Sequence, residues 1–135
     1  MGKLSFTVGS NDWVKVSLPS HRRGQGSVRT GTAKIHVDSL SCVVNVEFED
    51  RALKGFFSAA GKCYKKLKGR FSLAARDDSF VLRGEMAPQG HVRLEVNANR
   101  SYLKQRDDTQ WEIGAKFSCP AYCLADLLKS WEAQQ

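Results

Sequence analysis

Side chains that could carry out chemistry are present, but their spacing matches no common catalytic or metal-binding motif. The consecutive acids Asp77–Asp78 and Asp107–Asp108 fall in hydrophilic turns, which do not separate two carboxyl pKa values as acid–base catalysis requires. The segment GQGSVR at 24–29 contains two glycines, but it lacks the buried strand and the helix that flank a phosphate-binding loop. We therefore expect a protein that is not an enzyme and that needs no cofactor, with an enzyme of unrecognised type as an alternative.

Metal ligands are also poorly placed in the sequence. The histidines have no partner at ligand spacing: His21, His36 and His91. The cysteines form no CxxC pair; Cys42 lies in a strand pattern, and three more lie in helix patterns: Cys63, Cys119 and Cys123. Cys119 and Cys123 are one helical turn apart, which supports a metal site only with further ligands. We expect no metal and four reduced, mostly buried thiols.

Basic side chains offer a first candidate binding surface. In GKCYKKLKGR at 61–70, the lysines face away from an apolar helix stripe, and cations near the carbonyl end of a helix are favourable without any ligand. A second basic segment lies in the Gly- and Arg-rich stretch 20–33, which we expect to be a flexible loop. The candidate basic patch consists of Arg22, Arg23, Arg29, Lys62, Lys65 and Lys66.

Alternating strands in the second half of the chain offer another candidate surface. Their apolar residues face a core, so the intervening polar residues should project from the other side of a sheet. This candidate partner-binding sheet face consists of Arg83, Glu85, His91, Arg93, Glu95, Asn97, Glu112 and Lys116. Its mixed charges could either form cross-strand ion pairs with one another or match the charge pattern of a protein partner.

Two helices and several strands must position these side chains. The first helix is expected at about 51–67, with an apolar stripe of Leu53, Phe56, Phe57, Ala60, Tyr64 and Leu67, and the second at about 119–132, capped by Ser118. Period-two patterns predict about six to seven strands, and regular βαβ alternation is missing, so the sheet should be mainly antiparallel. The fold class is therefore α+β, a two-layer single domain over 1–135 with both helices packed on one face of the sheet.

Composition restricts the class of partner without naming it. The chain has 135 residues and a formal net charge of +7, and the excess positive charge lies within residues 1–70, so an acidic partner is favoured. A signal peptide and a run of about 18 apolar residues are both missing from the sequence. We therefore expect a cytoplasmic protein without a membrane partner.

The order of elements resembles a known family. The segments EFEDRALKGFF, FSLAARDDSFVLRGEM, GHVRLEV and WEIGAKFSCPAYCLADLLKSW, over roughly residues 42–131, are similar to small bacterial proteins catalogued as a domain of unknown function. Some members of that family are immunity proteins of polymorphic or contact-dependent toxins. The resemblance implies a non-enzymatic cytosolic protein that neutralises a cognate toxin domain by direct binding, and it supplies no binding residues.

Two functions from different classes follow. In the first, an immunity protein uses its charges to bind an acidic surface of a toxin domain. In the second, a nucleic-acid-binding module uses the basic patch on an RNA backbone. Nearly all aromatic residues occupy expected core positions, which leaves few to stack on bases and favours the first function. The sequence leaves the oligomeric state open.

Overall fold

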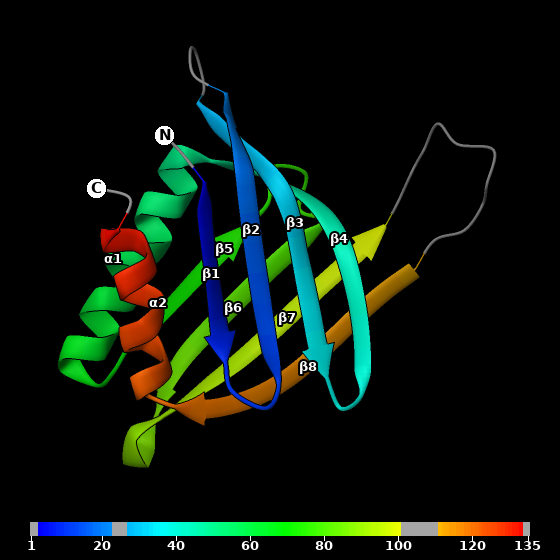
Figure 1. The fold of residues 1–135 in the computed structure, drawn as a ribbon. Coiled ribbons are helices and arrows are strands. Elements are labelled where there is room, and N and C mark those ends of the chain that lie inside the picture. The colour runs from blue at the N-terminus through cyan, green and yellow to red at the C-terminus, as the bar shows by residue number, and fades with distance from the viewer. Residues whose placement is uncertain (1–2, 23–26, 101–110, 134–135) are drawn as a thin grey trace.

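A computed structural model describes residues 3–22, 27–100 and 111–133, and these residues form eight strands and two helices in an α+β arrangement (Figure 1). The first half of the chain forms β1 (Leu4–Gly9), β2 (Trp13–Arg22), β3 (Val28–Val37), β4 (Leu40–Glu49) and α1 (Asp50–Lys66). The second half forms β5 (Arg70–Ala74), β6 (Phe80–Ala87), a 3-10 turn (Pro88–Gly90), β7 (His91–Arg100), β8 (Trp111–Pro120) and α2 (Tyr122–Glu132).

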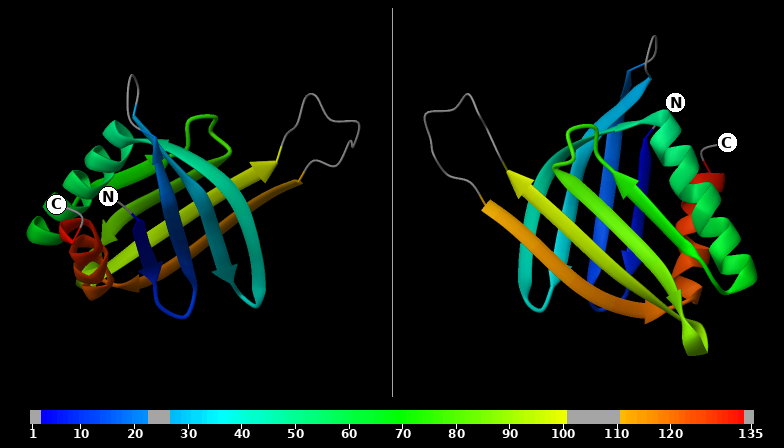
Figure 2. Two further views of the ribbon diagram at one scale, coloured as in Figure 1. Left: turned by 45° about the horizontal axis from the view of Figure 1, so that its top comes forward. Right: turned by 180° about the vertical axis from the view of Figure 1, so that it is seen from behind.

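The strands form two antiparallel sheets rather than one. Their orders are β1-β2-β3-β4 and β5-β6-β7-β8, and α1 connects the two along the chain. The sheets face each other with their strands crossing, and both helices lie at the side formed by β1 and β5 (Figures 1 and 2). The prediction of one sheet of six to seven strands, with the helices on its face, was therefore wrong. Each sheet buries its inner face against the other sheet.

Aromatic side chains join the helices to the sheets. The ring of Phe57 on α1 lies 5.1 Å from Phe6 on β1, edge to face, and 4.6 Å from Trp131 on α2, stacked. Phe56 contacts Phe71 on β5 at 5.7 Å. All four phenylalanines are buried in one cluster that includes residues of both sheets. The helices thus close the side of the molecule where β1 and β5 would otherwise be open edges.

The first helix begins and ends within one residue of its predicted bounds. Its buried side chains are Leu53, Phe56, Phe57, Ala60 and Cys63. The predicted stripe was wrong at its end, because Tyr64 is 38% and Leu67 60% exposed. Leu67 is the C-cap in the left-handed conformation, and its N–H donates to the Cys63 carbonyl. The chain therefore leaves the helix there and turns Leu67 away from the core.

Two boundary predictions were wrong because strand pairing continues beyond the apolar pattern. The stretch 20–33 is strand at 20–22 and from Val28 onward, where β2 pairs with β3, while 23–26 lies outside the described residues. Gly31 permits this pairing, since a Cβ there would lie 1.9 Å from the carbonyl oxygen of Ser17, beside a register shift in β2. Likewise, β8 remains paired with β7 up to Pro120, so α2 starts at Tyr122 rather than at 119.

Neither α1 nor α2 is long and apolar enough to cross a lipid bilayer, and these are the helices of the described chain.

Candidate functional site

The outer face of the β5–β8 sheet carries all eight residues of the predicted partner-binding face. Strand alternation places those of β6 and β7 there, because their neighbours along these strands are mostly buried, and pairing with β7 places Glu112 and Lys116 of β8 on the same face. Antiparallel pairing sets Arg83 opposite Glu95, and Glu95 opposite Lys116. Glu85 is opposite Arg93. The remaining three residues lie nearer the ends of the strands and pair with other positions: His91, Asn97 and Glu112.

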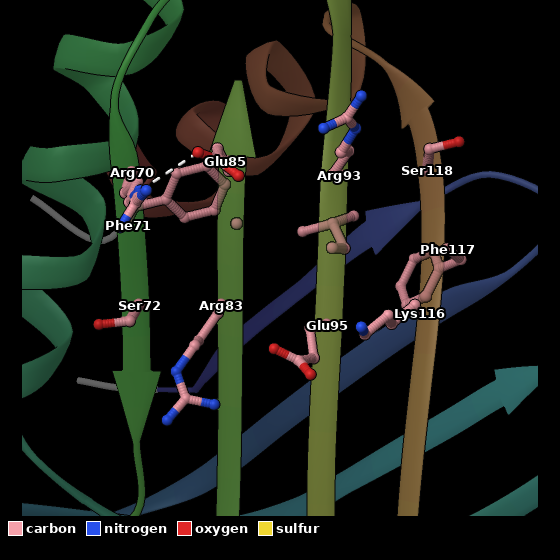
Figure 3. Close-up of a pocket in the computed structure, with 12 residues that line it drawn as sticks. Arg70, Phe71, Ser72, Arg83, Glu85, Arg93, Glu95, Lys116, Phe117 and Ser118 are labelled. Atoms are coloured by element: carbon pink, nitrogen blue, oxygen red, sulfur yellow. Dashed lines mark hydrogen bonds and ion pairs between the residues drawn. The ribbon is translucent and has the colours of Figure 1, made fainter. Parts of the chain in front are cut away.

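A hollow of about 810 Å³ lies in the middle of this face (Figure 3). We call it the charged hollow. The lining residues that project from the outer face of the sheet come from all four strands: Arg70, Ser72, Arg83, Glu85, Arg93, Glu95, Lys116 and Ser118. Five of these were predicted. His91, Asn97 and Glu112 share the face but do not line the hollow.

Three lining residues were missed, and the sequence contained a signal for two of them. Arg70 and Ser72 alternate with Phe71 and Leu73, which are buried, so the same period-two argument places them on the outer face. Ser118 was predicted to cap a helix. It is instead a strand residue opposite Arg93, because the β7–β8 pairing extends beyond it.

The charges in the hollow follow two rows across the sheet. One row contains Arg70, Glu85, Arg93 and Ser118, and the next contains Ser72, Arg83, Glu95 and Lys116. Positive and negative side chains therefore alternate along each row, with four cations against two carboxylates. The hollow is positive overall, and the two carboxylates lie at defined positions between the cations.

Ion pairing accounts for only part of this pattern. Arg70 Nε donates to Glu85 Oε2 at 3.2 Å, and both side chains remain substantially exposed, so this pair contributes at most about 1 kcal/mol to stability. Among the lining residues, the other opposite charges do not come within ion-pair distance. Arg83, Arg93, Glu95 and Lys116 are thus not paired with one another, and their charges are available to a partner.

Chemically, the described lining residues are suited to recognition of an acidic surface. They include three arginines, and guanidinium groups bind carboxylates through charge-assisted hydrogen bonds. Within the described part of the chain, no three potential metal ligands form a group. The arrangement can therefore bind a surface of complementary charge.

The predicted basic patch does not form one surface among the described residues. Arg29 is largely covered at the first turn of α1, where its Nε lies 3.7 Å from Asp50 Oδ1. Lys62, Lys65 and Lys66 are exposed near the other end of the helix, roughly 20–25 Å away at 1.5 Å per residue. The side chain of Arg22 and the whole of Arg23 lie outside the described residues, as does the side chain of His21.

The cysteine predictions were largely right about state and partly wrong about position. All four thiols are free, and three are buried, with Cys42 half-buried. Cys119 lies on β8 and Cys123 on α2, rather than both on one helix. Burial and the neighbouring thiol of Cys123 raise the pKa of Cys119 to about 12. Because the reactive form is the thiolate, Cys119 is chemically inert at neutral pH.

Comparisons of the chain with protein-family models, curated proteins and solved structures found no match. The interpretation of the charged hollow therefore depends on its own side chains and their arrangement.

Proposed function

We propose that this chain is a non-enzymatic binding protein that uses the charged hollow to bind an acidic surface of another protein. The observation that carries the proposal is the alternation of charge in the two rows, in which Arg83, Arg93 and Lys116 have no ion-pair partner among the lining residues. A positive hollow that also contains two carboxylates, Glu85 and Glu95, favours one charge pattern on a partner over others. Such complementarity raises the rate of encounter and selects the partner.

The partner's surface follows from this pattern. Carboxylates should face Arg83, Arg93 and Lys116, and a basic side chain should approach Glu95 between them. Glu85 already accepts a hydrogen bond from Arg70, so it contributes less attraction. The exposed lysines at the end of α1 add positive charge that would strengthen long-range attraction at low ionic strength.

The biological form of the proposal is toxin neutralisation. As a member of the immunity-protein family that the order of elements over residues 42–131 resembles, the chain would be a cytosolic inhibitor that occludes a toxin domain in a one-to-one complex. The test is to produce this chain together with the toxin domain encoded by a neighbouring gene, and to measure both cell growth and binding by calorimetry. Growth rescue with a stoichiometric complex is expected. Tight binding without rescue would contradict neutralisation but not partner binding.

Charge reversal tests the surface itself. Arg93→Glu and Glu95→Arg each leave the fold intact, because both side chains lie on the outer face, and each should weaken partner binding by roughly tenfold or more. Lys15→Glu is the matched control, since it reverses an exposed charge on β2 of the other sheet. Equal affinities for all three variants and the original chain would exclude the hollow as the binding surface.

RNA binding is the alternative that the same experiments must distinguish. It would use the lysines at the end of α1, which the structure separates from Arg29 by most of the helix length. Phosphate contacts of this kind weaken steeply with salt, and non-specific binding is weak near 200 mM salt, at roughly 10⁻⁴–10⁻⁶ M. Nanomolar binding to a generic RNA at that ionic strength would favour the nucleic-acid function and contradict the proposal.

A further inference from the structure

One half of β4 is an open sheet edge. The edges β1 and β5 are covered by α2 and α1 (Figures 1 and 2). The far half of β4 is covered by the turn after β5, where the N–H of Arg76 donates to the Glu47 carbonyl at 2.9 Å and its side chain pairs with the Glu47 carboxylate at 3.0 Å. The half of β4 next to the β3–β4 turn is Leu40–Val46. Among the described residues, its backbone makes no such hydrogen bond on the side away from β3.

The hydrogen-bonding direction of this half follows from its neighbours. The Glu47 carbonyl points away from β3, since it accepts a bond from Arg76, and backbone groups two residues apart in a strand point the same way. The tight turn between β3 and β4, with positive φ at Asp38 and Ser39, closes on the pair Val37–Leu40. This pairing directs the backbone groups of Leu40 toward β3, which agrees with the direction inferred from Glu47. The N–H and C=O groups of residues 41, 43 and 45 are therefore directed outward.

The side chains beside this edge are apolar and exposed. Leu40 is 71% and Val43 56% exposed. A cleft of about 280 Å³ runs between the end of the β3–β4 hairpin and β8, and its apolar lining includes Ile35, Val37, Leu40, Cys42, Ile113 and Ala115. An edge of this kind accepts another strand, through backbone hydrogen bonds and apolar contacts.

We propose that the open half of β4 pairs with β4 of a second copy of this chain, antiparallel and about a two-fold axis. The outward direction of residues 41, 43 and 45 sets the register. Val43 of one copy lies opposite Val43 of the other, and Ser41 lies opposite Asn45. This pairing joins the two first sheets into one continuous sheet, and it places a β-branched pair at the centre of the contact.

A second copy fits this edge better than an unstructured peptide. The pairing segment of each copy is already a regular strand, without a register shift against β3, so little conformational entropy is lost on association. Leu40–Val46 contains no charged residue and no proline, the residues that proteins use to block edge pairing. The contact is also the same patch on both copies, as a two-fold interface requires.

The test is the mass of the protein as a function of concentration, measured by sedimentation equilibrium with the whole chain. We expect reversible dimers, and association that strengthens with added salt because each copy carries a formal charge of +7. Val43→Lys places a charge at the centre of the pairing, and Asn45→Pro removes an outward N–H without touching the β3 ladder. Each should weaken dimerisation by roughly tenfold or more. Thr7→Lys on the exposed face of β1 is the matched control.

Hydrogen exchange provides a second measurement that a folding defect would not reproduce. The amides of Val43 and Asn45 should exchange more slowly at high protein concentration, while those of Cys42 and Val44, already bonded to β3, should not change. A chain that stays monomeric at about 1 mM, near the weakest affinity usually measured, would overturn the proposal. Dimers that persist unchanged in Val43→Lys, or a peptide bound at this edge by a monomeric chain, would also overturn it.

Discussion

At the scale of single residues, Leu67 holds a backbone conformation that leucine rarely adopts. Its φ is 57° and its ψ 32°, in the left-handed region, which costs an ordinary residue roughly 1–2 kcal/mol and glycine almost nothing. Its side chain is largely exposed, so its removal loses little buried apolar area. The position stores strain where the helix must end.

Leu67→Gly should therefore raise the free energy of unfolding by about 0.5–1 kcal/mol, because relief of the strain exceeds the extra entropy of glycine in the unfolded chain. Urea unfolding followed by circular dichroism measures the change. Lys65→Gly, two residues earlier and inside the helix, is the control and should lower stability by about 1 kcal/mol. A loss of stability in both variants would show that Leu67 contributes by packing.

At the scale of elements, the sequence predicted the strands in which apolar and polar residues alternate strongly. Apolar and polar residues alternate along 41–49 and 92–98, and both stretches are strands in the structure, while the first helix was placed to within a residue. The segment VRTGTA in β3 was missed because it is a strand through its pairing with β2 and β4 on either side. The residue pattern within one segment carries no information about which strands will pair with it. Five lining residues of the charged hollow were predicted because the period-two alternation of β6–β8 places them on the outer face of the sheet.

Close packing inside the second sheet depends on a residue without a side chain. Phe71 on β5 lies across Gly84 on β6, its direct partner, and a Cβ at Gly84 would come 2.2 Å from the ring. Gly84→Ala should push the ring aside and lower the free energy of unfolding by roughly 1–3 kcal/mol. The charged residues on the other side of β6 would move with the strand.

Thermal and urea unfolding measure the effect of Gly84→Ala. The matched control is Gly55→Ala in α1, where a Cβ meets no atom within 4 Å; it should raise stability by up to about 1 kcal/mol through helix propensity. Opposite signs for the same chemical change are the expected result. An unchanged stability in Gly84→Ala would mean that the ring repacks freely.

At the scale of the whole molecule, the sequence could not distinguish one sheet covered by helices from two sheets facing each other. Both arrangements bury one side of every strand, so both produce the same alternation, as for Val44 and Val46 in one sheet or Leu94 and Val96 in the other. The difference depends on which surfaces meet across the core. The order of four strands, helix, four strands, helix is compatible with either.

The tertiary arrangement predicts a distant effect of one aromatic contact. Trp131 on α2 stacks on Phe57 at 4.6 Å, and α2 also packs on β1. Trp131→Ala should lower the free energy of unfolding by roughly 2–4 kcal/mol and speed hydrogen exchange in β1, far away in sequence. Glu132→Ala, an exposed neighbour, is the control. Faster exchange confined to α2 would contradict the coupling.

The packing of α2 on β1 also has a consequence for the order of events during synthesis. β1 is made before its covering helix α2, on the order of ten seconds earlier at ordinary translation rates, because the other described elements lie between them. The β2–β4 strands can pair meanwhile, but β1 keeps one unpaired side. This side therefore closes only once α2 has been made, and chains arrested before 122–132 expose an uncovered strand edge to chaperones and to other nascent chains.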